Sequence, residues 1–262
     1  MKNILLTIEY DGTNFHGWQR QPGQRTVQGE IEKVLSKLFR QEVTITATSR
    51  TDSGVHALYQ KANFKGDFGI PTERIPLAAN NLLSGDVRIK SAEEVDLDFH
   101  ARFDAVGKKY IYIIRNASYD FTQRNFCYHI EKQLDHQSMK EAAQYLVGEQ
   151  DFKSFMAAGG KVPESTVRTI YSANFTLEPI DKGRKIVFEI IGNGFLYNMV
   201  RIIVGTLVDI GLGKISASDM KEIIESCNRS RAGHTAPPQG LYLSEIYFDY
   251  AELKKSLGGV NK

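Results

Sequence analysis

The segment Lys-Tyr-Ile-Tyr-Ile-Ile-Arg, residues 109–115, decides the expected fold, because it opens a second copy of an element order that precedes it. Its aromatic and β-branched residues favour a strand. After it, the apolar spacing predicts a helix, two strands, a long helix, a short helix and a closing strand. Their expected ranges are 138–147, 168–177, 184–191, 195–210, a start at the capping-box pattern 216–219, and 241–248.

The residues before this segment predict the same order of elements. Thr26 is a plausible N-cap for a helix whose apolar residues recur at helical spacing. The expected elements are a strand at 3–9, the helix from Thr26, strands at 43–46 and 59–64, a helix at 73–83 and a strand at 87–89. Each half therefore reads β-α-β-β-α-β, with an extra helix in the second.

This order is that of the ferredoxin-like unit. We expect an α+β fold of two ferredoxin-like halves with antiparallel sheets and an active-site cleft between them. The halves would be residues 1–105 and 106–262, with the boundary inside 103–107. Because this fold hosts many functions, it decides nothing about chemistry.

Composition excludes several classes of protein. The 262 residues are 42% hydrophobic, which is enough for a packed core and too much for a disordered tail or a collagen-like fibre. Cys127 and Cys227 are 100 positions apart, which argues against a disulfide scaffold and favours a reducing cytoplasm. The most apolar run, 202–212, contains Asp209, so we expect no membrane span and no membrane partner.

The net charge of +2, from 33 basic and 31 acidic residues, indicates no particular partner. Three windows, 12–29, 105–119 and 226–244, nevertheless contain no acidic residue and combine basic with aromatic side chains. Such mixtures suit a phosphate backbone and unstacked bases. Chance sampling is the alternative. From these windows we single out Arg20, Lys108 and Lys109 as weaker RNA-binding candidates.

Patterns for cofactors are incomplete. The glycines at 192 and 194 lack the third glycine of a dinucleotide fingerprint, and the run 211–214 lacks the first glycine of a phosphate loop. The six histidines show no metal-ligand spacing. We therefore expect neither a metal nor a nucleotide cofactor.

The sequence Ser-Arg-Thr-Asp-Ser-Gly-Val-His-Ala, residues 49–57, is dense in polar groups directly after an expected strand. Asp52 in such a run is compatible with an ordinary Asx-turn. The flanking Arg50 and His56 favour the alternative, a carboxylate presented in a polar cleft.

This loop resembles the catalytic loop of the tRNA pseudouridine synthase A family, usually written GRTDAGVHA. Ser49 and Ser53 replace its first glycine and its alanine, which leaves the detail of the loop open. Further blocks agree in order along almost the whole chain. They are Tyr10-Asp11-Gly12, 15–21, 26–28, 98–103, 109–110, 151–155, 198–201 and 240–243.

The resemblance implies isomerisation of uridine to pseudouridine in the anticodon arm of tRNA, at positions 38, 39 and 40. The N1–C1′ bond breaks, the uracil turns, and C5 bonds to C1′ without a redox change. Asp52 would be the catalytic carboxylate; whether it attacks the sugar, attacks the base or acts as a base stays open. Arg201 is the cation expected beside it, with a solvent-facing arginine as the alternative.

By the same resemblance, Tyr110 contacts the substrate, although packing in a core is the alternative for this strand residue. Arg50 would fill the gap in the RNA stack or hold its phosphate. His56 is a further RNA-binding candidate that could instead cap its loop, and Trp18 is better explained by packing.

The resemblance also implies a homodimer, with the tRNA running across both subunits. Two other functions compete with the isomerase: a non-catalytic RNA-binding or tRNA-chaperone module, and a sensor of small metabolites. The binding module does not require Asp52, and the sensor predicts a weak, salt-insensitive interaction with tRNA.

Overall fold

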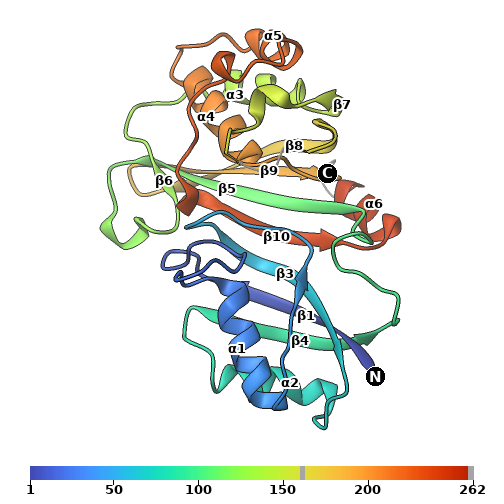
Figure 1. The fold of residues 1–262 in the computed structure, drawn as a ribbon. Coiled ribbons are helices and arrows are strands. Elements are labelled where there is room, and N and C mark those ends of the chain that lie inside the picture. The colour runs from blue at the N-terminus through green and yellow to red at the C-terminus, as the bar shows by residue number, and fades with distance from the viewer. Residues whose placement is uncertain (160–162, 259–262) are drawn as a thin grey trace. The chain divides into compact units, whose positions relative to one another are not determined.

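The computed structural model describes residues 1–159 and 163–258 and confirms an α+β fold (Figure 1). The chain divides into two compact units. The first contains Met1–Val106 together with Tyr242–Glu252. The second contains Gly107–Leu241 and the residues from Leu253 onward.

The first unit carries a sheet in the order β4-β1-β3-β10, with β2 paired to β3. β1 runs antiparallel to β3 and to β4, whereas β10 runs parallel to β3. The elements are β1 (Lys2–Tyr10), α1 (Val27–Phe39), β2 (Thr46–Ala47), β3 (His56–Gly66), α2 (Ile75–Asn80), β4 (Val87–Val95) and β10 (Leu241–Tyr247).

Helix α1 forms where the sequence predicts it. The Thr26 hydroxyl accepts a hydrogen bond from the backbone N–H of Gly29 at 3.3 Å, which satisfies one of the free donors of the first turn. Val27, Ile31 and Leu35 are fully buried on one face of the helix. Arg40 ends it in the left-handed conformation.

The second unit carries a sheet in the order β5-β9-β8-β7, with β6 paired to β5. Its elements are β5 (Gly107–Ala117), β6 (Tyr128–His129), α3 (His136–Gln144), β7 (Gly148–Asp151), β8 (Val167–Ile180), β9 (Gly183–Gly192), α4 (Met199–Gly211) and α5 (Asp219–Glu225). A last helix, α6 (Tyr250–Gly258), follows β10. No helix in the described residues is long and apolar enough to cross a membrane.

The strand expected at 43–46 is wrong, because only Thr46 and Ala47 pair with β3. Val43 and Ile45 are buried as the alternation predicts, yet their backbone N–H groups donate to side chains of α1. The acceptors are the hydroxyl of Ser36, at 2.9 Å, and Oε1 of Glu32, at 3.0 Å. Side chains of the helix therefore replace a neighbouring strand.

The closing strand expected in the second half groups mostly with the first unit. β10 occurs where the alternation predicts it, but its residues from Tyr242 belong to the first unit, where Tyr242 pairs with His56. The second unit instead has the short strands β6 and β7, which the sequence did not indicate. Alternation identifies a strand but not its partner.

Two buried asparagines fix the loop that leads out of β4. Asn63 donates to the side-chain oxygen of Asn3 at 2.9 Å and accepts from the backbone N–H of Ala101 at 3.0 Å. Asn3 in turn donates to the carbonyls of Asp96 and Phe99, at 2.8 and 2.9 Å. This pair connects the centre of the sheet to the segment 96–101.

We predict that Asn3→Ala lowers the free energy of unfolding by about 1–3 kcal/mol, because buried acceptors lose their donor. Chemical denaturation measures this, and Asn81→Ala, at an exposed helix end, is the control. Equal stability of the two variants would contradict the structural role of the pair.

Candidate active site

The loop 49–57 joins β2 to β3, and the segment 10–18 holds it in place. The carbonyl of Thr51 accepts from the N–H of Trp18 at 3.0 Å, and its hydroxyl lies 2.8 Å from that of Tyr10. The N–H of Gly54 donates to the carbonyl of Phe15 at 3.3 Å. Two motifs that are 30 or more positions apart therefore form one structure.

Two glycines allow the close approach of these segments. A Cβ at Gly12 would lie 2.0 Å from the carbonyl oxygen of Val55. Gly17 has a φ of +80°, and a Cβ there would lie 2.6 Å from the carbonyl oxygen of Thr51. Only glycine fits such contacts between backbones.

Of the two departures from the family motif, Ser53 makes a side-chain hydrogen bond in this loop, and Ser49 makes a backbone one. The hydroxyl of Ser53 donates to the carbonyl of Phe15 at 3.1 Å, a bond that an alanine could not make. The carbonyl of Ser49 accepts from the side-chain amide of the buried Gln60 at 2.7 Å. Ser53 thus adds a side-chain hydrogen bond to the backbone contacts that hold the loop.

Asp52 lies at the turn of this loop, where its carbonyl accepts from the N–H of Val55 at 3.2 Å. Thr51 and Val55 are buried, whereas Asp52 is only half-buried and Arg50 is exposed. The loop therefore has anchored flanks and a more accessible carboxylate between them.

His56, the further RNA-binding candidate, lies in the interior of the first unit. Its side chain is buried, stacks on Tyr242 with ring centroids 4.6 Å apart, and accepts from the N–H of Gly12 through Nδ1 at 3.0 Å. Oδ1 of Asp11 lies 3.2 Å from the same nitrogen. His56 thus supports the loop from within the unit, because its ring is shielded from the surface.

Arg201 lies on α4, held at its side chain and its backbone. Its Nη1 donates to Oδ1 of Asn198 at 2.6 Å, and its Nε donates to the carbonyl of Ala236 at 2.8 Å. The N–H of Ala236 donates back to the carbonyl of Arg201 at 3.0 Å. A Cβ at Gly205 would lie 1.8 Å from the carbonyl oxygen of His234. The face of α4 that carries Arg201 and Gly205 therefore packs on the segment 234–236.

Asp209 fixes that segment, a role that the sequence reasoning missed. Its carboxylate lies 3.0 Å from Nδ1 of His234 and 2.7 Å from Nζ of Lys214. Burial alone would raise the pKa of Asp209, but the hydrogen bonds from Lys214 and His234 lower it below its usual value. The sequence contains a clue to this role: an acidic residue within the most apolar helix indicates that its carboxylate is paired with another side chain.

Tyr110 and Tyr112 share the buried face of β5, as alternation predicts. Tyr112 is a core residue: its ring is fully buried, and its hydroxyl donates to the carbonyl of Pro237 at 2.7 Å. Burial raises the pKa of Tyr112 well above its usual value. Tyr110 packs edge-on against Phe195, with ring centroids 5.1 Å apart.

In the folded chain, basic residues from the windows that contain no acidic residue lie next to acidic side chains from other parts of the sequence. Arg25 pairs with Asp86 at 2.7 Å, and this hydrogen bond lowers the pKa of that carboxyl despite partial burial. Nζ of Lys109 lies 3.2 Å from Glu189, and Nη1 of Arg20 lies 3.3 Å from the buried Glu32. Lys108 is half-buried. Two of the three candidates, Arg20 and Lys109, therefore have an acidic neighbour.

The predicted site residues fall into two sets. Asp52, Arg50, Arg20 and His56 belong to the first unit, and Tyr110, Arg201, Lys108 and Lys109 belong to the second. The expected pairing of Asp52 with Arg201 joins the two sets and stays a prediction. Within residues 1–159 and 163–258 there is no group of three or more His, Cys, Asp and Glu side chains that could hold a metal ion.

Comparisons with known proteins agree on one family. A family model described as tRNA pseudouridine synthase matches residues 6–104 and 142–249. A tRNA pseudouridine synthase A of Acetivibrio thermocellus is 50% identical over 249 residues, which cover 95% of this chain and 100% of the relative. The protein of the same name from Caldicellulosiruptor bescii is 49% identical with the same coverage.

We predict that Gly12→Ala lowers the free energy of unfolding by about 1–3 kcal/mol, because the new Cβ would overlap the carbonyl of Val55. Hydrogen exchange should show lost protection at Gly54 and Val55. Gly69→Ala is the matched control, since a Cβ at Gly69 meets no atom within 4 Å. Unchanged protection in Gly12→Ala would contradict the packing of the two segments.

The lowered pKa of Asp209 predicts a pH dependence of stability. A carboxyl with a depressed folded-state pKa stabilises the protein above its unfolded pKa of about 3.9, and this contribution is lost as pH falls through the folded pKa. Asp209→Asn should therefore be less stable than wild type at pH 7, with a difference that shrinks below about pH 4. A difference independent of pH, in denaturation at a series of pH values, would show that the charge is not responsible.

Proposed function

This chain belongs to the tRNA pseudouridine synthase A family, and we propose that it modifies the anticodon arm of tRNA at positions 38, 39 and 40 with Asp52 as its catalytic carboxylate. The protein is an isomerase that converts uridine in tRNA to pseudouridine. This function excludes the two alternatives, a binding module and a metabolite sensor, as its main activity.

The observation that carries the catalytic assignment is the anchored loop 49–57. An isomerase that breaks and remakes one glycosidic bond needs a carboxylate held against an extruded nucleotide. Both flanks of Asp52 are fixed by backbone hydrogen bonds to Phe15 and Trp18, while Asp52 itself is only half-buried. Such a carboxylate is positioned before the substrate arrives, so little ordering remains to be done on binding.

The other residues have distinct roles in this proposal. Arg201 is the cation that keeps the carboxylate ionised, and its two hydrogen bonds to Asn198 and Ala236 limit the directions in which its guanidinium can point. Tyr110 packs against the uracil once the base is extruded. Arg50, exposed beside Asp52, takes the vacated place in the RNA stack or the phosphate next to it.

The reaction as proposed needs no metal or nucleotide cofactor, because it gains and loses no atom and no electron. We also propose that the enzyme acts in the cytoplasm as a homodimer, with the tRNA in contact with both subunits. Sedimentation of the protein alone and with tRNA tests the dimer, which would be contradicted by a monomer in both samples.

We predict that Asp52→Asn binds tRNA with wild-type affinity but forms no detectable pseudouridine, because an amide cannot supply the ionised oxygen. Pseudouridine mapping on treated tRNA measures the product and its positions. Asp67→Asn, an exposed aspartate in the same unit, is the matched control and should keep full activity. A wild-type rate in Asp52→Asn would remove the catalytic assignment.

We predict that Arg201→Gln lowers kcat and moves the acidic limb of the pH–rate profile upward, because loss of a nearby cation raises the pKa of a carboxyl. Single-turnover rates between pH 5 and 9 measure both effects. An increase in KM with an unmoved pH profile would mean that Arg201 only binds the substrate.

A further inference from the structure

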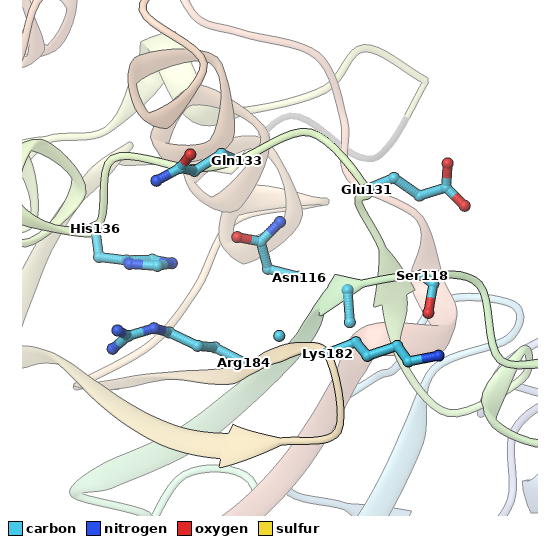
Figure 2. A pocket seen from close by; sticks show the side chains of 9 residues that line it. Asn116, Ser118, Glu131, Gln133, His136, Lys182 and Arg184 are labelled. Carbon is cyan, nitrogen blue, oxygen red and sulfur yellow. The ribbon is translucent and has the colours of Figure 1, made fainter.

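A second polar site lies in the second unit, at the end of β5 that is far from Tyr110. It is a pocket with a volume of about 250 Å³. A water molecule occupies roughly 30 Å³ in the liquid, so the pocket has room for a ligand larger than one water molecule. Figure 2 shows its lining side chains. They come from the end of β5, the loop 131–136 and the hairpin turn between β8 and β9.

The walls of this pocket are fixed by hydrogen bonds. Asn116 donates through its side chain to the carbonyls of Ile130 and Lys132, at 2.7 and 2.8 Å. On the other side, the hairpin between β8 and β9 approaches β5 closely at Gly183. A Cβ at this position would lie 2.3 Å from the carbonyl oxygen of Asn116. These contacts fix the backbone around the pocket before any ligand binds.

Basic side chains outnumber acidic ones in the lining of this pocket, with Lys182 and Arg184 against Glu131. Lys182 and Arg184 line the pocket from the hairpin turn, and in the described part of the chain neither takes part in a salt bridge. In contrast, Lys185, the next residue of β9, pairs with Glu178 at 3.0 Å. The one acidic lining residue, Glu131, lies at the other end of the pocket from His136 and Arg184 in Figure 2, and accepts from the N–H of Tyr119.

His136 adds an unfilled hydrogen-bonding position. Its Nε2 is buried and has no hydrogen-bond partner in the structure. Burial, and then the positive charge of Arg184, lower the pKa of His136, whereas the neighbouring Asp135 raises it. Figure 2 shows His136 and Arg184 one above the other at the same end of the pocket. An anion at that end would be attracted by the guanidinium of Arg184.

We propose that this pocket binds a phosphate of the tRNA backbone, as a contact separate from the one that holds the modified uridine. Lys182 and Arg184 are both exposed at the tip of a hairpin, which suits a phosphate of a long polymer. The guanidinium of Arg184 and the ammonium of Lys182 lie at opposite ends of the pocket in Figure 2. Arg184 would therefore hold the phosphate at the His136 end and Lys182 an adjacent part of the backbone, and neither contact reads the sequence. The proposal rests on the proposed function for the position of the uridine near Tyr110.

The pocket lies far along β5 from Tyr110. Six positions separate Tyr110 from Asn116, which at about 3.3 Å per residue is about 20 Å. A phosphate held in the pocket would therefore belong to another part of the tRNA than the target nucleotide.

The test compares Arg184→Gln with Lys185→Gln, both built on Asp52→Asn so that binding is measured without turnover. Arg184→Gln should weaken tRNA binding about 3- to 10-fold at low salt and reduce the slope of log K against log salt by about 0.7–0.9, the loss of one phosphate contact. Lys185→Gln should leave both quantities unchanged. Lys182→Asn, which tolerates the φ of +55° at that position, should act as Arg184→Gln does.

An unchanged affinity and slope in Arg184→Gln would overturn the proposal. Titration with inorganic phosphate, followed by the ring resonances of His136, separates the other source of this ligand. If inorganic phosphate shifts these resonances while the tRNA slope is unaffected by Arg184→Gln, the pocket binds a free anion and the RNA contact is wrong. If Asp52→Asn proves active, the catalytic assignment fails, but the comparison of affinities still decides the phosphate site.

Discussion

The close contact between the backbones of residues 10–18 and 49–57 is the constraint on which the candidate site depends. It is possible only because Gly12 and Gly17 have no side chain, and it is completed by hydrogen bonds from Trp18 and Gly54. The contact leaves Asp52 half-buried between anchored neighbours. The two motifs are separate in the sequence but belong to one family pattern, because each packs directly against the other.

In the second unit, Arg201 is held by a similar close contact between backbones. Gly205 lets the segment 234–236 approach α4, and the buried carboxylate of Asp209 holds that segment through His234. In both units, then, a close contact between backbones and the buried polar groups around it hold a candidate site residue in place. Such support from the surroundings limits the movement of a reactive group before substrate binds.

Charge is distributed differently from what the sequence suggested. Basic residues in the acid-free windows acquire acidic partners when the chain folds, as Arg25 does with Asp86. The unpaired cations Lys182 and Arg184 lie instead in a hairpin that no window included. A stretch without acids in the sequence is thus a poor guide to local charge, because side chains from distant strands neutralise it.

The sequence by itself determined the α+β class, the helix that begins after Thr26, the shared face of Tyr110 and Tyr112, and the family, because these depend on local spacing and on motifs in order. The tertiary structure alone decided that β10 joins the first unit, that Val43 and Ile45 bond to a helix, and that His56 is buried. The reason is that periodicity records which side of an element faces a core. The identity of its neighbour depends on contacts between residues far apart in the chain.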